Sequence, residues 1–187
     1  MGASSTGLGI AAGLVLLVGG GAARAASLET PSLPYIDKGA CPFECCTYRA
    51  WTTNAPVDVR AKPDAKSPLV FHLNKNIPVT GVTGETITDK YGVTHMTQAE
   101  KIGYDQKTKK PLLNLRPGDT IYPLHYAGEG SVFFWFKGQT YEEILDDGSS
   151  RDASKPHYVW WVNIKTKDGK SGWTDQTKRF DGTDSCS

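Results

Sequence analysis

The chain has 187 residues, which is enough for one domain or two very small ones. It carries 21 basic and 20 acidic residues, so its formal charge is +1. Scattered charges with so small an excess give no electrostatic attraction to nucleic acid or to an anionic membrane, and we expect no nucleic-acid partner.

Residues 1–25 are predicted to be a cleavable secretory signal. Residues 10–18 form an unbroken run of small and apolar residues, and Ala23-Arg24-Ala25 has the small-x-small pattern of a cleavage site. A membrane anchor is the alternative, although the run is shorter than the roughly 20 residues that span a bilayer. Cleavage would remove one arginine and bring the formal charge to about zero. An exported chain of this kind is predicted to be periplasmic or secreted. Contact with a membrane is expected only through an uncleaved signal.

Residues 26–46 read as an irregular, cysteine-rich lead-in. Four cysteines in an exported chain indicate two disulfides, for which three connectivities exist. A bond between the adjacent Cys45 and Cys46 would strain the intervening peptide, so we expect one of Cys41, Cys45 and Cys46 to pair with Cys186. A metal site is the alternative, but no histidine lies beside the Cys-x-x-x-Cys-Cys segment. We expect no metal and no cofactor.

The rest of the chain alternates between short β-prone segments and turns. Strands are predicted at residues 47–51, 57–60, 69–73, 77–82, 112–115, 120–126 and 131–136. A hairpin is predicted within residues 86–96, around Lys90-Tyr91-Gly92, and the one predicted helix is short and covers residues 140–145. The predicted fold class is therefore all-β with very little helix.

The clearest prediction is a β-hairpin at residues 158–173. Residues 160–165 alternate with the period of a strand that has one buried face, which requires Trp160 and Trp161 to face opposite sides. Asp168-Gly169 predicts a tight turn with two positive-φ positions. Two strands are not stable alone in water, so this hairpin is expected to belong to a small barrel.

Two segments resemble the bacterial SH3-like domain family. Residues 57–80, beginning Val-Asp-Val-Arg-Ala-Lys-Pro, resemble its opening, and residues 161–173 are similar to its close, where a Trp-led strand meets a Gly-Trp strand. The intervening residues leave two arrangements open, namely two tandem SH3-like units or one barrel with a large insertion. A faint repeat between residues 77–85 and 121–129 favours two disulfide-stapled units, at residues 47–110 and 111–187.

No catalytic or metal-binding motif is present. No pair of the four histidines has a ligand spacing. His72 and His125 each lie between two apolar or aromatic neighbours, so both are expected on the solvated face of a strand. Glu129 lies between two glycines and has no second carboxylate beside it. Its carboxylate is expected to accept hydrogen bonds from turn amides or to pair with a lysine. We therefore expect no enzymatic activity.

The aromatic residues remain as candidates for function. They make up 10% of the chain, and alternation turns part of them away from the core. Either these rings cover each other between two units, or they form a groove for an extended ligand. The resemblance implies a cell-wall peptide or glycan, or an envelope protein, as partner. The predicted contact residues are Tyr122, Tyr126, Glu129, Trp135 and Trp161.

The rival hypothesis is a cell-envelope hydrolase or an inhibitor of one. A hydrolase would need the fold to bring His125, Glu129 and a distant aspartate together. The sequence specifies neither the ligand nor the oligomeric state.

Overall fold

The computed structural model describes residues 1–2, 30–104, 108, 110–145 and 148–186. Nearly all of the predicted signal segment therefore lies outside the described residues. Within the described ranges the chain folds as β-strands plus two 3₁₀ turns, η1 (Gly128–Gly130) and η2 (Thr177–Arg179). The all-β prediction is confirmed. None of the helices in these ranges has the length and apolar character needed to cross a membrane.

The larger sheet has eight strands. Seven follow the order β15-β2-β5-β13-β14-β3-β4, and β1 pairs with β5 beside that path. The strands are β1 (Tyr35–Lys38), β2 (Ala50–Thr53), β3 (Val57–Arg60), β4 (Leu69–Leu73), β5 (Pro78–Lys90), β13 (His157–Thr166), β14 (Ser171–Thr174) and β15 (Phe180–Asp181). The long strands β5 and β13 pair antiparallel along nearly their whole length.

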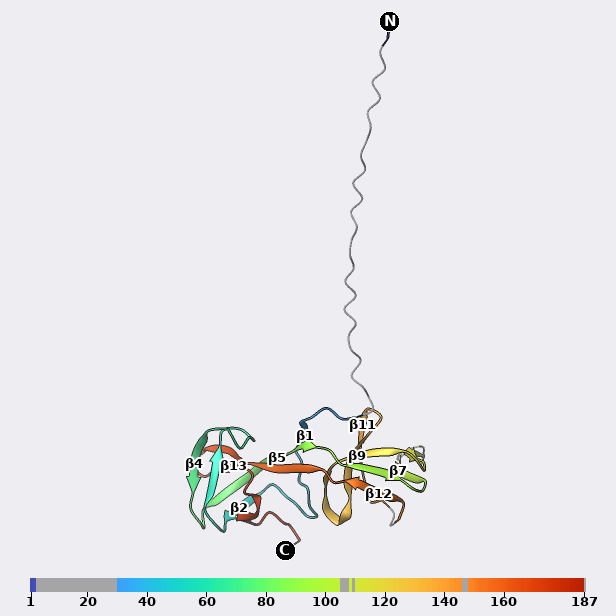
Figure 1. Cartoon of the computed structure of the whole chain (residues 1–187). Helices are drawn as coiled ribbons and strands as arrows, with labels where there is room; N and C mark the ends of the chain where they lie inside the picture. Colours follow the sequence, from blue (N-terminus) through green and yellow to red (C-terminus); the bar gives the residue numbers. More distant parts are fainter. Residues whose placement is uncertain (3–29, 105–107, 109, 146–147, 187) are drawn as a thin grey trace.

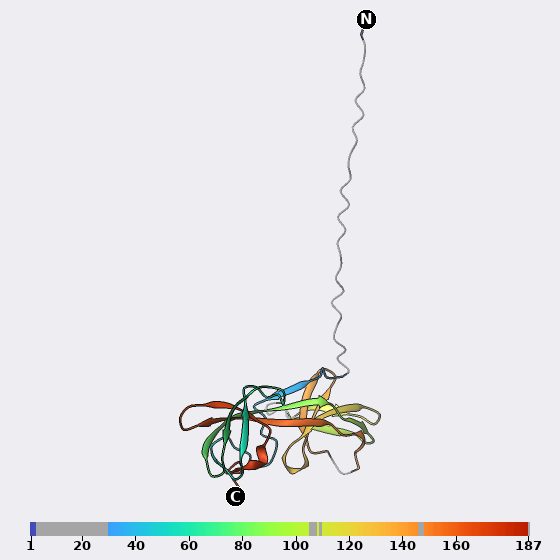
Figure 2. The same cartoon turned by 60° about the vertical axis from the view of Figure 1, so that its left-hand side comes forward.

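The chain between β5 and β13 forms a second sheet of five strands in the order β11-β10-β9-β6-β12, together with the paired strands β7 and β8. The strands are β6 (Val93–Met96), β7 (Glu100–Tyr104), β8 (Pro111–Leu115), β9 (Thr120–Tyr126), β10 (Val132–Phe136), β11 (Gln139–Glu143) and β12 (Ser150–Ser154). Figures 1 and 2 show two lobes, with β5 and β13 running from one to the other.

This topology does not confirm two successive units. Strands from both predicted units, 47–110 and 111–187, share the larger sheet, and the predicted boundary falls between the paired strands β7 and β8. The strand order instead matches the second arrangement above, in which a large segment is inserted into one sheet. The backbone hydrogen bonds between β5 and β13 close the two ends of that insertion.

Each lobe has its own hydrophobic core. The first core consists of Trp51, Val57, Val59, Leu73, Val79, Val162, Ile164 and Phe180. The second consists of Met96, Ile102, Leu115, Ile121, Val132, Phe134 and Phe136. Strand β3 shows how the alternation in sequence creates the core, because Val57 and Val59 are fully buried and the residues that follow each of them are not. Burial of one such side chain contributes about 1.5–3 kcal/mol.

The disulfides join Cys41 to Cys46 and Cys45 to Cys186. The expectation that one N-terminal cysteine pairs with Cys186 is confirmed, and the adjacent pair is not joined. Disulfides persist in oxidising compartments, so these bonds indicate an extracytoplasmic environment. The Cys45–Cys186 bond ties the lead-in to the C-terminal segment, beside the β-bridge of Cys46 and Asp184.

Three local predictions are wrong. The predicted helix at residues 140–145 is instead strand β11, since Lys137 and Gly138 take positive φ values of 45° and 92° and turn the chain back along β10. The lead-in is not wholly irregular, because Tyr35–Lys38 pairs with β5. The hairpin at residues 86–96 does not form, because β5 and β6 belong to different sheets.

The hairpin at residues 158–173 is confirmed as β13 and β14, but its turn is wider than predicted. Only Gly169 has a positive φ, at 87°. The amide of Gly169 donates to the carbonyl of Thr166 at 3.0 Å, and the amide of Thr166 donates to the carbonyl of Lys170 at 2.9 Å. The Thr166 hydroxyl donates to the Asp168 carboxylate and holds this longer loop.

Candidate functional site

The five predicted contact residues do not form one surface. Tyr122 and Trp135 are cross-strand neighbours on β9 and β10. Tyr126, at the end of β9, packs against the second core. Glu129 lies in η1 and lines a separate cavity, whereas Trp161 lies on β13 and lines a groove of its own.

Tyr122 and Trp135 each pack against another aromatic ring. The ring centroids of Tyr122 and Tyr91 are 5.2 Å apart, and those of Trp135 and Tyr35 are 6.4 Å apart. Tyr35 also lies 6.3 Å from Phe133. Tyr35 belongs to β1 of the larger sheet, whereas Trp135 belongs to β10 of the second sheet. These rings therefore cover each other between the two sheets, which is the first of the two interpretations of the aromatic residues given above.

Trp161 lies at the floor of a groove of about 400 Å³ on the first lobe. Its side chain is only 4% exposed. Alternation along β13 is confirmed, since Trp160 packs against the first core while Trp161 lines the groove. The apolar side chains around Trp161 are Pro34, Ile36, Pro63, Ala65, Ile87 and Val159.

The lead-in strand β1 supplies one apolar wall of this groove. Ile36 of β1 is the register partner of Ile87 on β5. The side chain of Ile36 remains 42% exposed, although both residues line the groove. A ligand therefore reaches the groove through an accessible aliphatic wall, with the nearly buried indole beneath it.

The charged residues of the groove are all acidic, namely Asp64, Asp89 and Asp175. The carboxylate of Asp89 lies 2.6 Å from Nδ1 of His157. The carboxylate of Asp64 accepts a hydrogen bond from the backbone amide of Lys66 at 2.8 Å. Within the described part of the chain, the Asp175 carboxylate has no hydrogen bond or ion pair. Since none of the described residues that line the groove is a lysine or an arginine, the groove attracts cationic groups.

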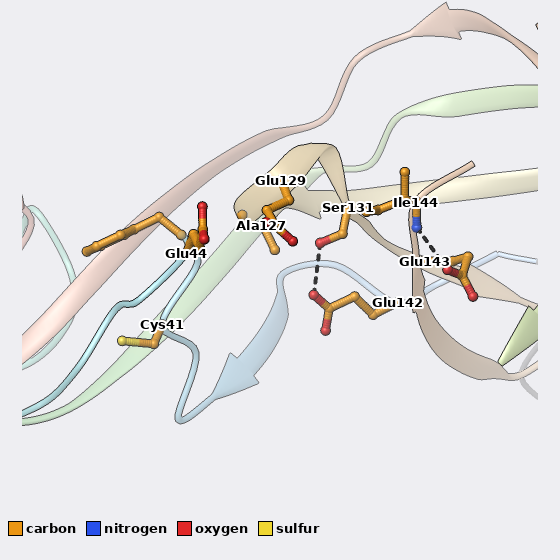
Figure 3. Close-up of a pocket in the computed structure, with 10 residues that line it drawn as sticks. Cys41, Glu44, Ala127, Glu129, Ser131, Glu142, Glu143 and Ile144 are labelled. Carbon is orange, nitrogen blue, oxygen red and sulfur yellow. Dashed lines mark hydrogen bonds between the residues drawn. The ribbon is translucent and has the colours of Figure 1, made fainter. Parts of the chain in front are cut away.

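A second cavity, of about 450 Å³, lies between the disulfide loop and the second sheet (Figure 3). Its acidic residues are Glu44, Glu129, Glu142 and Glu143. The hydroxyl of Ser131 donates a hydrogen bond to the carboxylate of Glu142 at 3.0 Å. The carboxylate of Glu143 accepts hydrogen bonds from the backbone amides of Gly103 and Ile144, at 3.1 and 3.2 Å.

Glu129 is not paired in the way that was expected. It has a positive φ of 55°, and its carboxylate contacts neither a turn amide nor a lysine among the described residues. The turn lies directly against the disulfide loop, because a Cβ at Gly128 would come within 2.3 Å of the Glu44 amide nitrogen. This close approach places Glu44 at the wall of the cavity.

One group of residues has the spacing of metal ligands within the described ranges, namely Glu44, Cys45 and Cys186. The two sulfur atoms are bonded to each other in a disulfide. They therefore offer no thiolate, and a single carboxylate remains. The geometry gives no support to a metal site there.

His125 is buried, so the prediction that it is solvated is wrong. Its side chain is 5% exposed and its Nε2 atom lies 3.0 Å from the Asp37 carboxylate. The register between β9 and β10 shifts by one residue at Leu124, which breaks the strict alternation that the prediction assumed. His72 is exposed, as predicted.

The His125–Asp37 pair has only part of the geometry of a hydrolase. The fold brings the histidine to a distant aspartate, but Glu129 lines the neighbouring cavity and contacts neither residue. The second ring nitrogen, Nδ1, faces the carbonyl of Tyr126 at 3.4 Å. Both ring nitrogens therefore have protein oxygen atoms as neighbours, Asp37 at 3.0 Å and the Tyr126 carbonyl at the longer distance.

Two tyrosines have perturbed acidity. Burial raises the pKa of Tyr48 above its ordinary value of 10.0; the hydrogen bond with Trp160 opposes this rise, and the charge of Asp37 adds to it. Burial also raises the pKa of Tyr126, and Asp152 and Tyr158 add to the effect. Both phenols are thus held in the neutral form.

No family model matches the chain, and no curated protein or solved structure shows significant similarity to it.

Sequence reasoning identified Trp161 but missed the residues that surround it. Pro34 and Ile36 lie in a segment that reads as irregular, and Asp175 follows β14, far from Asp64 in the sequence. The sequence Tyr-Ile-Asp-Lys at residues 35–38 does not alternate between apolar and polar side chains, so it gave no local signal for a strand there. The convergence of Asp64 and Asp175 depends on tertiary structure alone.

Proposed function

We propose that this protein is an exported, non-catalytic binding module of the bacterial cell envelope, which holds an extended peptide or glycan such as peptidoglycan in the Trp161 groove. The observation that supports this most directly is an indole at the floor of a groove with accessible apolar walls. Open grooves lined by aromatic and proline side chains bind extended ligands well, because a ligand that is already extended loses little conformational entropy on binding.

Two further features agree with this proposal. The disulfides suit an exported protein, and the two segments that resemble an SH3-like domain contribute Pro63 and Trp161 to the groove. The rival activity, hydrolysis, has less support, because both nitrogens of His125 are directed at protein oxygens. The same purified protein is suitable for testing both.

The test is sedimentation of the disulfide-bonded protein with purified peptidoglycan sacculi. We expect the protein to pellet with the sacculi, and the Ile36→Ser variant to pellet less because an accessible wall of the groove loses its apolar side chain. Val82→Ser is the matched control, since Val82 is 49% exposed and does not line the groove. Absence of binding would contradict the proposal, and clearing of the sacculi suspension would identify a hydrolase instead.

A further inference from the structure

We infer that the ligand of the Trp161 groove is a peptide that carries ammonium groups next to apolar side chains, and that Asp64 and Asp175 recognise those groups. This inference rests on the proposed function and names the chemistry of the ligand. It follows from the pairing of an apolar floor with an exclusively acidic rim.

The rim charges come from parts of the chain that fold around the same floor. Asp64 lies in the loop between β3 and β4, Asp89 at the end of β5, and Asp175 directly after β14. All three side chains are exposed at the rim. Their fields add at the groove, because the part of its lining that the structure describes holds no lysine or arginine to cancel them.

The three carboxylates differ in the number of hydrogen bonds and ion pairs that they already make with protein groups. Asp89 is held by His157 at 2.6 Å, which reduces its capacity to bind a further cation. Asp64 accepts one backbone amide and retains a second oxygen. Asp175 has no hydrogen bond or ion pair in the described chain. Asp64 and Asp175 are therefore the carboxylates available for a ligand.

The apolar floor distinguishes this ligand from a free cation. A hydrated ion gains nothing from the side chains of Ile36 and Val159, whereas a peptide covers them with its own aliphatic side chains. Ammonium groups on the same peptide then reach the rim. A neutral glycan can cover the floor and donate hydroxyl hydrogen bonds to the carboxylates, but it brings no opposite charge to them.

The acidic cavity of Figure 3 is a poorer site for such a peptide. Glu142 and Glu143 already accept hydrogen bonds from Ser131, Gly103 and Ile144. The part of the chain that lines it offers Phe43 as its one aromatic ring, and that ring packs against Trp160. This cavity therefore serves as the comparison site in the experiment.

The experiment compares native sacculi with sacculi treated with acetic anhydride, which converts free amines to uncharged amides. We expect acetylation to weaken co-sedimentation of the unaltered protein. The Asp64→Asn/Asp175→Asn variant should bind native sacculi about two- to twenty-five-fold more weakly, since each exposed charge pair is worth about 1.4- to five-fold in affinity. Asp168→Asn/Asp181→Asn, with the same charge change outside the groove, should bind like the unaltered protein.

The possible results separate the two proposals. Equal binding to native and acetylated sacculi would overturn the inference and leave the proposed function standing. Loss of binding in a Glu142→Gln/Glu143→Gln variant, with the groove variant unaffected, would overturn the assignment to Asp64 and Asp175. If native sacculi do not bind at all, the proposed function fails and the inference fails with it. Circular dichroism of each variant confirms that the fold is retained.

Discussion

The Nε2 atom of His125 lies 3.0 Å from the Oδ2 atom of Asp37, and this contact joins the two sheets. His125 belongs to β9 of the inserted sheet, whereas Asp37 belongs to β1, which pairs with β5. The ring of His125 also stacks on Phe133, at 4.8 Å, and packs against Tyr158, at 5.8 Å. The pair is therefore a polar contact within an aromatic layer between the lobes.

Replacement of Asp37 by alanine is expected to lower the free energy of unfolding by about 1–3 kcal/mol, because it leaves a buried ring nitrogen without its partner. Urea denaturation followed by tryptophan fluorescence measures this loss. Asp58→Ala is the matched control, since Asp58 pairs with His72 at 2.7 Å on the surface. That exposed pair is expected to contribute about 0.2–1 kcal/mol. Equal losses in the two variants would contradict a structural role for the buried pair.

The two disulfides are expected to contribute unequally to stability. The Cys45–Cys186 bond joins residues 141 apart, and the Cys41–Cys46 bond joins residues five apart. On the chain-entropy model, paired replacement by serine costs about 5 kcal/mol for the first bond and about 2 kcal/mol for the second. Guanidinium denaturation of the two double variants tests this order, and a larger loss for Cys41→Ser/Cys46→Ser would reverse it.

Stability is expected to fall at alkaline pH because of Tyr48 and Tyr126. The folded state raises the pKa of both phenols above the ordinary value of 10.0, so it binds their protons more tightly than the unfolded chain does. Their contribution is complete below that value and is lost as the pH rises through the raised pKa. Urea denaturation at a series of pH values up to 11 measures the decline.

A Tyr48→Phe/Tyr126→Phe variant isolates the two phenols. It is expected to be less stable at neutral pH, since Tyr48 donates to the carbonyl of Ala40, but to show a shallower decline above pH 10. Absorbance at 295 nm monitors ionisation of the phenols in parallel. An unchanged slope in the variant would assign the alkaline loss to other groups.

Local patterns were sufficient to predict the strands, but not how the strands pair. Strands β4 and β9 have the bounds that alternation predicted, and Trp160 and Trp161 face opposite sides as required. The pairing of β5 with β13 joins residues between 67 positions apart (His157 and Lys90) and 87 positions apart (Thr166 and Val79), and no local signal specifies such a register. The inserted sheet was therefore divided between two consecutive units in the prediction.

The candidate site shows the same limit. Trp161 was predicted from its aromatic character and its strand, but the prediction that it presents an open face did not include β1, which was read as irregular. His125 was misjudged because the extra residue Leu124 in β9 changes the face on which it lies. Convergence of side chains from distant segments depends on strand order, which composition and periodicity do not encode.

The lead-in also contacts β5 at Gly84, beyond the pairing of β1 with β5. The carbonyl of Ala40 accepts hydrogen bonds from Tyr48 and from the indole of Trp160, the latter at 3.0 Å, and the amide of Gly39 donates to the carbonyl of Gly84 at 2.7 Å. A Cβ at Gly84 would lie within 3 Å of the Tyr48 hydroxyl, the Trp160 indole nitrogen and the Ala40 carbonyl oxygen itself. The backbone of Gly84 needs no positive φ, so the requirement for glycine is steric.

The Gly84→Ala variant is expected to lose about 1–3 kcal/mol of unfolding free energy, because an added methyl group in a packed site forces its neighbours apart. Removal of the Tyr48 hydroxyl takes away the nearest of those neighbours, at 2.1 Å from the Cβ position. The same substitution should therefore cost less in a Tyr48→Phe background, where the indole of Trp160 still opposes it. A double-mutant cycle in urea measures the difference. Additive losses would show that a side chain at position 84 does not meet the Tyr48 hydroxyl.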